Sequence, residues 1–79
     1  MNHKEIFDNI KKIIFKIKKN LTCNISEEDN LADDLGLSSF EMLIFVQNLN
    51  SKLKINISDK DIRENLKIQN LINFILKLK

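Results

Sequence analysis

The residues best suited to chemistry lie in one short segment, residues 33–41, which reads DDLGLSSFE. Gly36 is the only glycine in the chain, and its conformational freedom is used just before an expected helix start. Ser38 and Glu41 fit a capping box, in which each side chain binds the backbone amide of the other. This arrangement presents a serine hydroxyl in the first turn of a helix, where free amides and the helix dipole favour a phosphate group.

The serine hydroxyl is a poor candidate for the nucleophile of an enzyme. A catalytic serine needs a base, and the single histidine, His3, lies near the N-terminus. Asp33 and Asp34 are two adjacent acids without further ligands, so solvated loop acids explain them better than a metal site. Cys23 is expected to be a small loop or core residue and not a reactive thiol. We therefore expect no catalytic residue and no metal site, and interpret the serine as a residue to be modified.

Apolar residues recur at steps of three and four along most of the chain, which is the pattern of amphipathic helices. Residues 20–37 carry polar turn residues instead, so we expect a long connection there. A loop of this length is usually functional, and its spaced apolar residues indicate that it is held against the core. The helices we expect span residues 3–19, residue 38 or 39 to about 53, residues 61–64 and residues 68–78.

Length and composition set the fold class. A chain of 79 residues makes one small domain, and with no proline, one glycine and 43% apolar residues it does not suit a β-sandwich, a barrel or a disordered tail. The sequence has no apolar run of about 18 residues that would span a membrane. We expect residues 1–79 to form a single all-α domain. It should be a cytoplasmic four-helix up-down bundle, with three longer helices, one short helix and a long first loop.

The net charge of +2 conceals three regions of different sign. Residues 1–20 hold six lysines against two acids, residues 21–51 hold six acids and no base, and residues 52–79 hold seven bases against three acids. Local fields should matter more for partners than the total charge. The basic first helix could be a nucleic-acid face, although a solvated lysine face on an amphipathic helix explains it better.

Residues 33–41 resemble the attachment segment of the acyl and peptidyl carrier proteins, whose signature is an Asp-x-Leu-Gly-x-Asp-Ser-Leu run. Residues 33–37 match this signature well. Ser38 stands where the family usually has aspartate, Ser39 stands where it has the modified serine, and Phe40 replaces the usual leucine. The resemblance extends over residues 4–76, in the order of first helix, long loop, second helix, short extended link, short helix and last helix.

The resemblance implies a carrier protein and not an enzyme. A phosphopantetheinyl transferase would attach 4′-phosphopantetheine from coenzyme A to Ser39, chosen over Ser38 because its offset from Gly36 matches the family. The thiol of the arm would hold an acyl or aminoacyl group as a thioester for the loading and transfer enzymes of fatty acid, polyketide or nonribosomal peptide synthesis. We expect a monomer that binds no nucleic acid. The residues expected to contact partners are Asp33, Asp34, Leu37, Phe40, Glu41 and Ile44.

The second helix is expected to have two apolar faces. Phe40 and Ile44 lie about opposite the core face, so we expect both to be substantially exposed and to offer partners an apolar contact. The family's second helix is usually rich in acids that face basic partners, whereas Glu41 is the only acid here. We expect the acidic residues 27–41 to guide the loading enzyme. The expected core face comprises Met42, Phe45, Val46, Leu49 and Leu53.

Two other functions fit parts of the sequence. The lysine-rich helices suggest a small DNA-binding module, but the second helix is flanked by acids and carries no base before Lys52. A helical adaptor domain without a prosthetic group is the second alternative. Modification by a promiscuous phosphopantetheinyl transferase with coenzyme A would separate all three.

Overall fold

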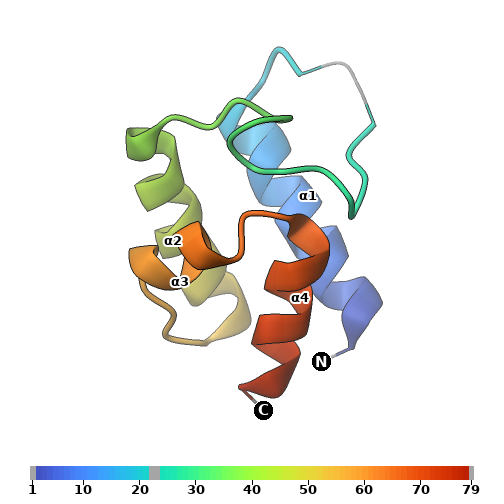
Figure 1. The fold of residues 1–79 in the computed structure, drawn as a ribbon, viewed down its shortest axis with the longest axis vertical. Helices are drawn as coiled ribbons and strands as arrows, with labels where there is room; N and C mark the ends of the chain where they lie inside the picture. The colour runs from blue at the N-terminus through green and yellow to red at the C-terminus, as the bar shows by residue number, and fades with distance from the viewer. Residues whose placement is uncertain (1, 22–23, 79) are drawn as a thin grey trace.

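The computed structural model describes residues 2–21 and 24–78, so the expectation for Cys23 lies outside the described residues. The described chain forms four helices: α1 (His3–Ile17), α2 (Ser39–Leu53), α3 (Asp59–Glu64) and α4 (Ile68–Lys77) (Figure 1). None of the described helices is long and apolar enough to cross a membrane. The expected all-α class is confirmed.

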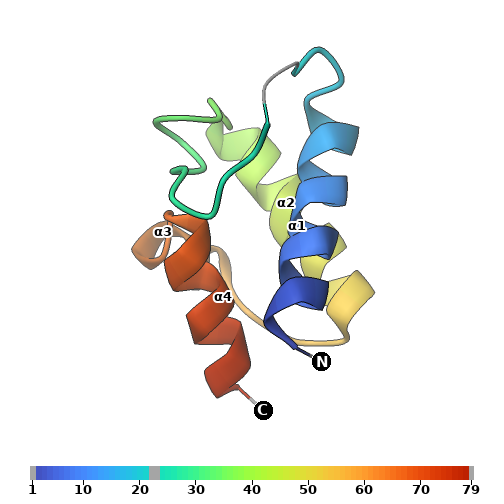
Figure 2. The same ribbon diagram turned by 90° about the vertical axis from the view of Figure 1, so that its right-hand side faces the viewer.

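The helices pack as an up-down bundle. α1 leads away from the end where both termini lie, and α2 returns antiparallel to it (Figures 1 and 2). α4 packs along α1, and α3 contacts α2. The long loop between α1 and α2 crosses the opposite end of the molecule. This topology places the start of α2, with its two serines, toward the end that is far from the termini.

The core is built from the residues that recur at helical spacing. α1 and α4 each contribute four buried residues, and α2 buries the five residues expected from its pattern. Phe45 of α2 has no exposed surface, and truncating it to alanine should cost about 3–5 kcal/mol. The residues that these three helices bury are Ile6, Ile10, Ile13, Ile14, Met42, Phe45, Val46, Leu49, Leu53, Ile68, Leu71, Ile72 and Ile75.

Capping residues decide where the helices begin. Capping boxes at Ser38 and Ser58 start α2 and α3, because each serine and the residue three positions later satisfy one another's backbone N–H groups. The second box makes α3 begin at Asp59, earlier than expected. α1 ends at Ile17, before its expected end, because Lys18 leaves the helical backbone conformation.

The long loop is held on the core by side chains and by backbone hydrogen bonds. The Leu31 N–H donates to the Leu66 carbonyl (2.9 Å), and the Ile68 N–H donates to the Asp29 carbonyl (3.0 Å). The second bond caps α4, whose N-cap residue Lys67 makes no side-chain capping bond among the described residues. The expected anchoring is confirmed, and the buried loop side chains are Ile25, Leu31, Leu35 and Leu37.

Candidate functional site

The approach to α2 starts with a turn organised by Asn30. Its side-chain oxygen accepts hydrogen bonds from the N–H groups of Ala32 and Asp33, both at 2.8 Å, and its own N–H donates to the Asp34 carboxylate (2.6 Å). Asp33 and Asp34 are both exposed, but within the described residues only Asp34 uses its carboxylate in a hydrogen bond. The two adjacent acids therefore differ: Asp34 shapes the turn, and Asp33 leaves its charge in solvent.

The structure does not support a metal site at Asp33 and Asp34. In residues 2–21 and 24–78 no group of three or more His, Cys, Asp or Glu side chains could hold a metal ion. The carboxylate of Asp34 is already engaged by the Asn30 N–H. The acids of this turn are accounted for by backbone hydrogen bonding and solvent.

Gly36 adopts the left-handed backbone conformation, with φ at 70°. That region costs other residues roughly 1–2 kcal/mol. No atom lies within 4 Å of the position that a Cβ would occupy, so the need for glycine is conformational and not steric. The Gly36 N–H donates to the Ala32 carbonyl (3.1 Å), and the Leu37 N–H donates to the Leu31 carbonyl (3.0 Å). The chain therefore turns sharply just before α2.

The two adjacent serines have different roles. Ser38 is the N-cap: its Oγ accepts from the Glu41 N–H (3.2 Å), and its N–H donates to Glu41 Oε1 (2.9 Å). Ser39 is the first residue of α2 and is exposed, and its hydroxyl has no hydrogen-bond partner within the described chain. The Ser38 hydroxyl is committed to the helix, whereas the Ser39 hydroxyl is available.

The amides beside Ser39 suit an anionic group. The N–H groups of Ser39 and Phe40 belong to the first turn of α2 and find no acceptor in the part of the chain that the structure describes. Together with the positive end of the helix dipole, they favour a phosphate. A phosphodiester on the Ser39 oxygen therefore fits the residues present.

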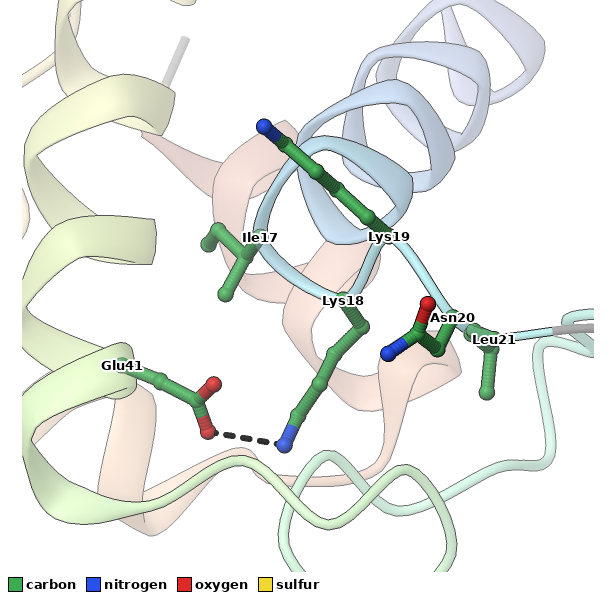
Figure 3. A pocket seen from close by; sticks show the side chains of 6 residues that line it. All are labelled: Ile17, Lys18, Lys19, Asn20, Leu21 and Glu41. Atoms are coloured by element: carbon green, nitrogen blue, oxygen red, sulfur yellow. Dashed lines mark ion pairs between the residues drawn. The ribbon is translucent and has the colours of Figure 1, made fainter.

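Glu41 joins the first turn of α2 to the end of α1. Its Oε1 lies 2.9 Å from the Lys18 Nζ (Figure 3). The same oxygen accepts the hydrogen bond from the Ser38 N–H. The Ser38 backbone hydrogen bond and the Lys18 ammonium hold the pKa of Glu41 below its usual value. The role of Lys18 could not be predicted from the sequence, because the pairing depends on how two helices meet. Glu41 thus fixes the relative position of the two helix ends.

The exposed apolar residues of α2 are only partly those expected. Phe40 is 70% exposed, as expected. Ile44 was expected to be exposed and is half-buried, because it lines a groove together with Ile17 of α1. Leu43, which is 47% exposed, was missed. Its position three residues after Phe40 was the available signal, since such residues are neighbours on a helix surface.

Leu37 differs from its expected role as a partner contact. It is 5% exposed and belongs to the core. The turn at Gly36 reverses the chain so that Leu37 packs inward immediately before the exposed serines. Its side chain is not part of the accessible surface around the site.

A groove of about 430 Å³ runs between the end of α1 and the first half of α2. A second hollow of about 460 Å³ shares Ile17, Lys19 and Glu41 with it and extends along residues 17–21 (Figure 3). Both lie beside the start of α2. We call the first the α1–α2 groove; it is lined by Lys16, Ile17, Lys19, Phe40, Glu41, Ile44 and Asn48.

Known proteins are similar to this chain in sequence over most of its length. The family model for the phosphopantetheine attachment site matches residues 11–75. An acyl carrier protein of Campylobacter lari is 29% identical over 73 residues, which cover 92% of this chain and 95% of that protein. One from Campylobacter jejuni is 27% identical with the same coverage. One from Thermotoga maritima is 26% identical over 76 residues, which cover 96% of this chain and 94% of that protein.

The family match and the geometry agree. Proteins of this family are carriers that work with modifying and acyl-handling enzymes, and the four-helix bundle with an exposed serine at the start of α2 suits that role. The DNA-binding and adaptor alternatives are not favoured, because the match spans the second half of the lysine-rich first helix as well as the serine segment. The chain therefore belongs to the phosphopantetheine attachment site family and is a carrier protein with covalent 4′-phosphopantetheine, not an enzyme.

Proposed function

We propose that Ser39 is the attachment residue and that its arm carries acyl or aminoacyl groups as thioesters. The difference between the two serines carries this proposal. Ser38 Oγ is bound to the Glu41 N–H, whereas Ser39 Oγ is exposed and has no partner in the described chain. When bound, the prosthetic group supplies a terminal thiol on a flexible tether, which gives its cargo a high local concentration at partner enzymes.

The chain contributes position and not catalysis to the loading reaction. Ser39 Oγ would form a bond to the phosphorus that bears the pantetheine arm of coenzyme A, the pyrophosphate P–O bond would break, and adenosine 3′,5′-bisphosphate would leave. The serine proton would pass to a base of the loading enzyme. The chain's own His3 is at the start of α1, toward the far end of the bundle. The N–H groups of Ser39 and Phe40 favour the phosphate, and the capping box keeps the first turn of α2 in place.

The loading enzyme we propose is a phosphopantetheinyl transferase that approaches the acidic loop, residues 27–34. Five acids and no base lie in this segment, and Glu28, Asp33 and Asp34 are exposed. A negative field of this kind attracts a basic partner chiefly by raising the association rate. The carboxylates of Glu28 and Asp33 make no hydrogen bond or ion pair within the described residues, and Asp33 is the nearer of the two to Ser39 along the chain. We therefore propose Asp33 as the main steering residue of the turn.

The other partner contacts we propose lie on α2. Phe40 is exposed beside Ser39, and Ile44 follows it within the α1–α2 groove. Glu41 supports this surface indirectly, because its carboxylate is held by Ser38 and Lys18. We do not propose Leu37 as a partner contact, because its side chain is buried.

Intact-mass spectrometry tests the attachment residue. The chain is incubated with a promiscuous phosphopantetheinyl transferase and coenzyme A, alongside Ser39→Ala and the matched Ser38→Ala. We expect the wild type and Ser38→Ala to gain one phosphopantetheine group and Ser39→Ala to gain none. Unchanged modification of Ser39→Ala, with loss only in Ser38→Ala, would show that the neighbouring serine is used.

We further propose that residues 1–79 form one carrier domain that acts as a monomer in the cytoplasm, in fatty acid, polyketide or nonribosomal peptide synthesis. The family match over residues 11–75 supports a single domain. Sedimentation equilibrium of the loaded chain tests the monomer, and a mass that rises with concentration would contradict it.

A further inference from the structure

The α1–α2 groove adjoins the proposed attachment residue and presents apolar surface there. Phe40, which follows Ser39 directly, lines it, and Ile44 and Ile17 add apolar side chains from α2 and α1. Leu43 stands on α2 with 47% of its surface exposed. A bundle of this size buries most of its large apolar residues, so an exposed group beside the arm indicates a contact surface.

The charges around this groove are positive. Lys16 and Lys19 line it, and both are exposed. The one acid that lines it, Glu41, lies 2.9 Å from the Lys18 Nζ, so its charge is countered. α2 carries no other acid as far as Leu53. A partner that enters the groove therefore meets two lysines and no uncompensated carboxylate among the residues that line it.

The acidic loop carries the opposite sign and approaches the attachment residue with its last two acids, Asp33 and Asp34. It leads into the turn at Gly36 and so to Ser39, while the groove reaches Ser39 from α1 and α2. The carrier therefore presents two surfaces of opposite charge beside one attachment residue. Complementary charge on a partner selects between such surfaces, and like charge is rejected.

We propose that the α1–α2 groove is the docking site for acyl-handling enzymes whose contact surface carries Asp or Glu side chains around an apolar residue. The partners then divide by charge: a basic loading enzyme meets the acidic loop, and an acidic acyl-handling enzyme meets the groove. This inference rests on the proposed attachment at Ser39, because an arm rooted there gives an enzyme docked in the groove access to the cargo.

The observations favour a protein partner over an anionic membrane or a nucleic acid. Lysines beside an exposed phenylalanine would also attract those polyanions. An extended anionic surface, however, would also meet the exposed acids Asp33 and Asp34, which lie in the turn that leads to Ser39, and would be repelled. A compact protein contact can engage Lys16 and Lys19 without touching the acidic loop.

Two synthetic peptides provide the probe. Both form an amphipathic helix with the same leucine face; one has glutamates beside that face, and the other has lysines. Each is titrated into the ¹⁵N-labelled chain, apo and loaded, while backbone amide shifts are followed. We expect the glutamate peptide to shift the amides of Phe40, Ile44 and Asn48 and to bind there about tenfold more tightly than the lysine peptide. Equal binding of the two peptides at the groove would overturn the proposal.

Charge reversal supplies the matched control. Lys16→Glu with Lys19→Glu should weaken the glutamate peptide about tenfold, because each change removes an attraction and adds a repulsion. Lys4→Glu with Lys77→Glu makes the same change in net charge toward the end that holds the termini, and should alter affinity less than about twofold. Equal losses of affinity in both variants would show that net charge alone explains the effect and would overturn the proposal.

Two further measurements separate the possible failures. Binding of phosphatidylglycerol vesicles that depends on Lys16 and Lys19, without preference for the glutamate peptide, would overturn the protein partner in favour of a lipid surface. Intact mass reports attachment independently. A chain that gains no prosthetic group contradicts the proposed function. The titration of the apo chain still shows whether the groove prefers an acidic or a basic peptide.

Discussion

The acidic loop and the α1–α2 groove both adjoin Ser39, but their charged residues are used differently. In the loop, Asp29 and Asp34 accept backbone hydrogen bonds from Ser26 (2.8 Å) and Asn30 (2.6 Å), so these carboxylates also hold the turn together. In the groove, Lys16 and Lys19 are exposed, and neither takes part in an ion pair of the described chain. The loop combines structure with charge, whereas the groove lysines carry charge alone.

Charged residues in the two regions therefore contribute differently to the fold. A change at a loop acid that accepts a backbone hydrogen bond, such as Asp34, should alter both stability and partner binding, because the loop also caps α4 and buries four side chains in the core. A change at the groove rim should alter partner binding with little effect on stability.

The largest difference should appear between Leu31 of the loop and Leu43 of α2. Leu31 has no exposed surface, and Leu31→Ala should lower the free energy of unfolding by about 2–5 kcal/mol. The matched change Leu43→Ala should lower it by less than about 0.5 kcal/mol, since that side chain is 47% exposed. Urea unfolding followed by circular dichroism measures both. A loss for Leu31→Ala as small as the one expected for Leu43→Ala would mean that the loop is not an integral part of the core.

A smaller difference is expected between the adjacent acids of the loop. Asp34→Ala should lower the free energy of unfolding by about 0.5–1.5 kcal/mol, because the Asn30 N–H loses its acceptor. Asp33→Ala should leave it unchanged within about 0.5 kcal/mol. Both should slow loading at low salt, and the difference from wild type should shrink as salt rises. Loading rates that do not change with salt concentration or with either aspartate substitution would contradict steering by the acidic loop.

The smallest effect concerns the pair that joins the helix ends. The pKa of Glu41 is lowered in the folded chain, so its contribution to stability is fully present above the ordinary carboxyl value and is lost as the pH falls through the lowered pKa. Lys18→Met should raise the pKa of Glu41 toward the ordinary value and reduce this acid-dependent loss. Lys19→Met is the control, since the pair to Glu41 involves Lys18. Identical acid-unfolding curves for wild type and Lys18→Met would exclude the pair as a source of the shift.

Local features were the most predictable. The capping box at Ser38, the glycine turn and the isoleucine spacing of α1 depend on neighbours within a few residues, and all are found as expected. The predicted end of α1 and the predicted start of α3 were less accurate, because a departure from helical backbone at Lys18 and a cap at Ser58 decide them. The distinction between the two serines also follows from a local rule, since an N-cap hydroxyl is used by the helix that it starts.

Features that depend on two helices meeting were not predictable. Ile44 was assigned to an exposed face by its angle around α2 alone, but Ile17 at the end of α1 contributes to the same groove and reduces its exposure. The pairing of Lys18 with Glu41 has the same origin. A helical wheel gives the angles within one helix and says nothing of the neighbour that covers it.

The central claim is that Ser39, and not Ser38, bears the prosthetic group. Tandem mass spectrometry of the digested, loaded wild-type chain tests it directly, using backbone fragments that cleave between the two serines. We predict that the added mass stays with fragments that contain Ser39 and is absent from N-terminal fragments that end at Ser38. Added mass on fragments that end at Ser38 would contradict it.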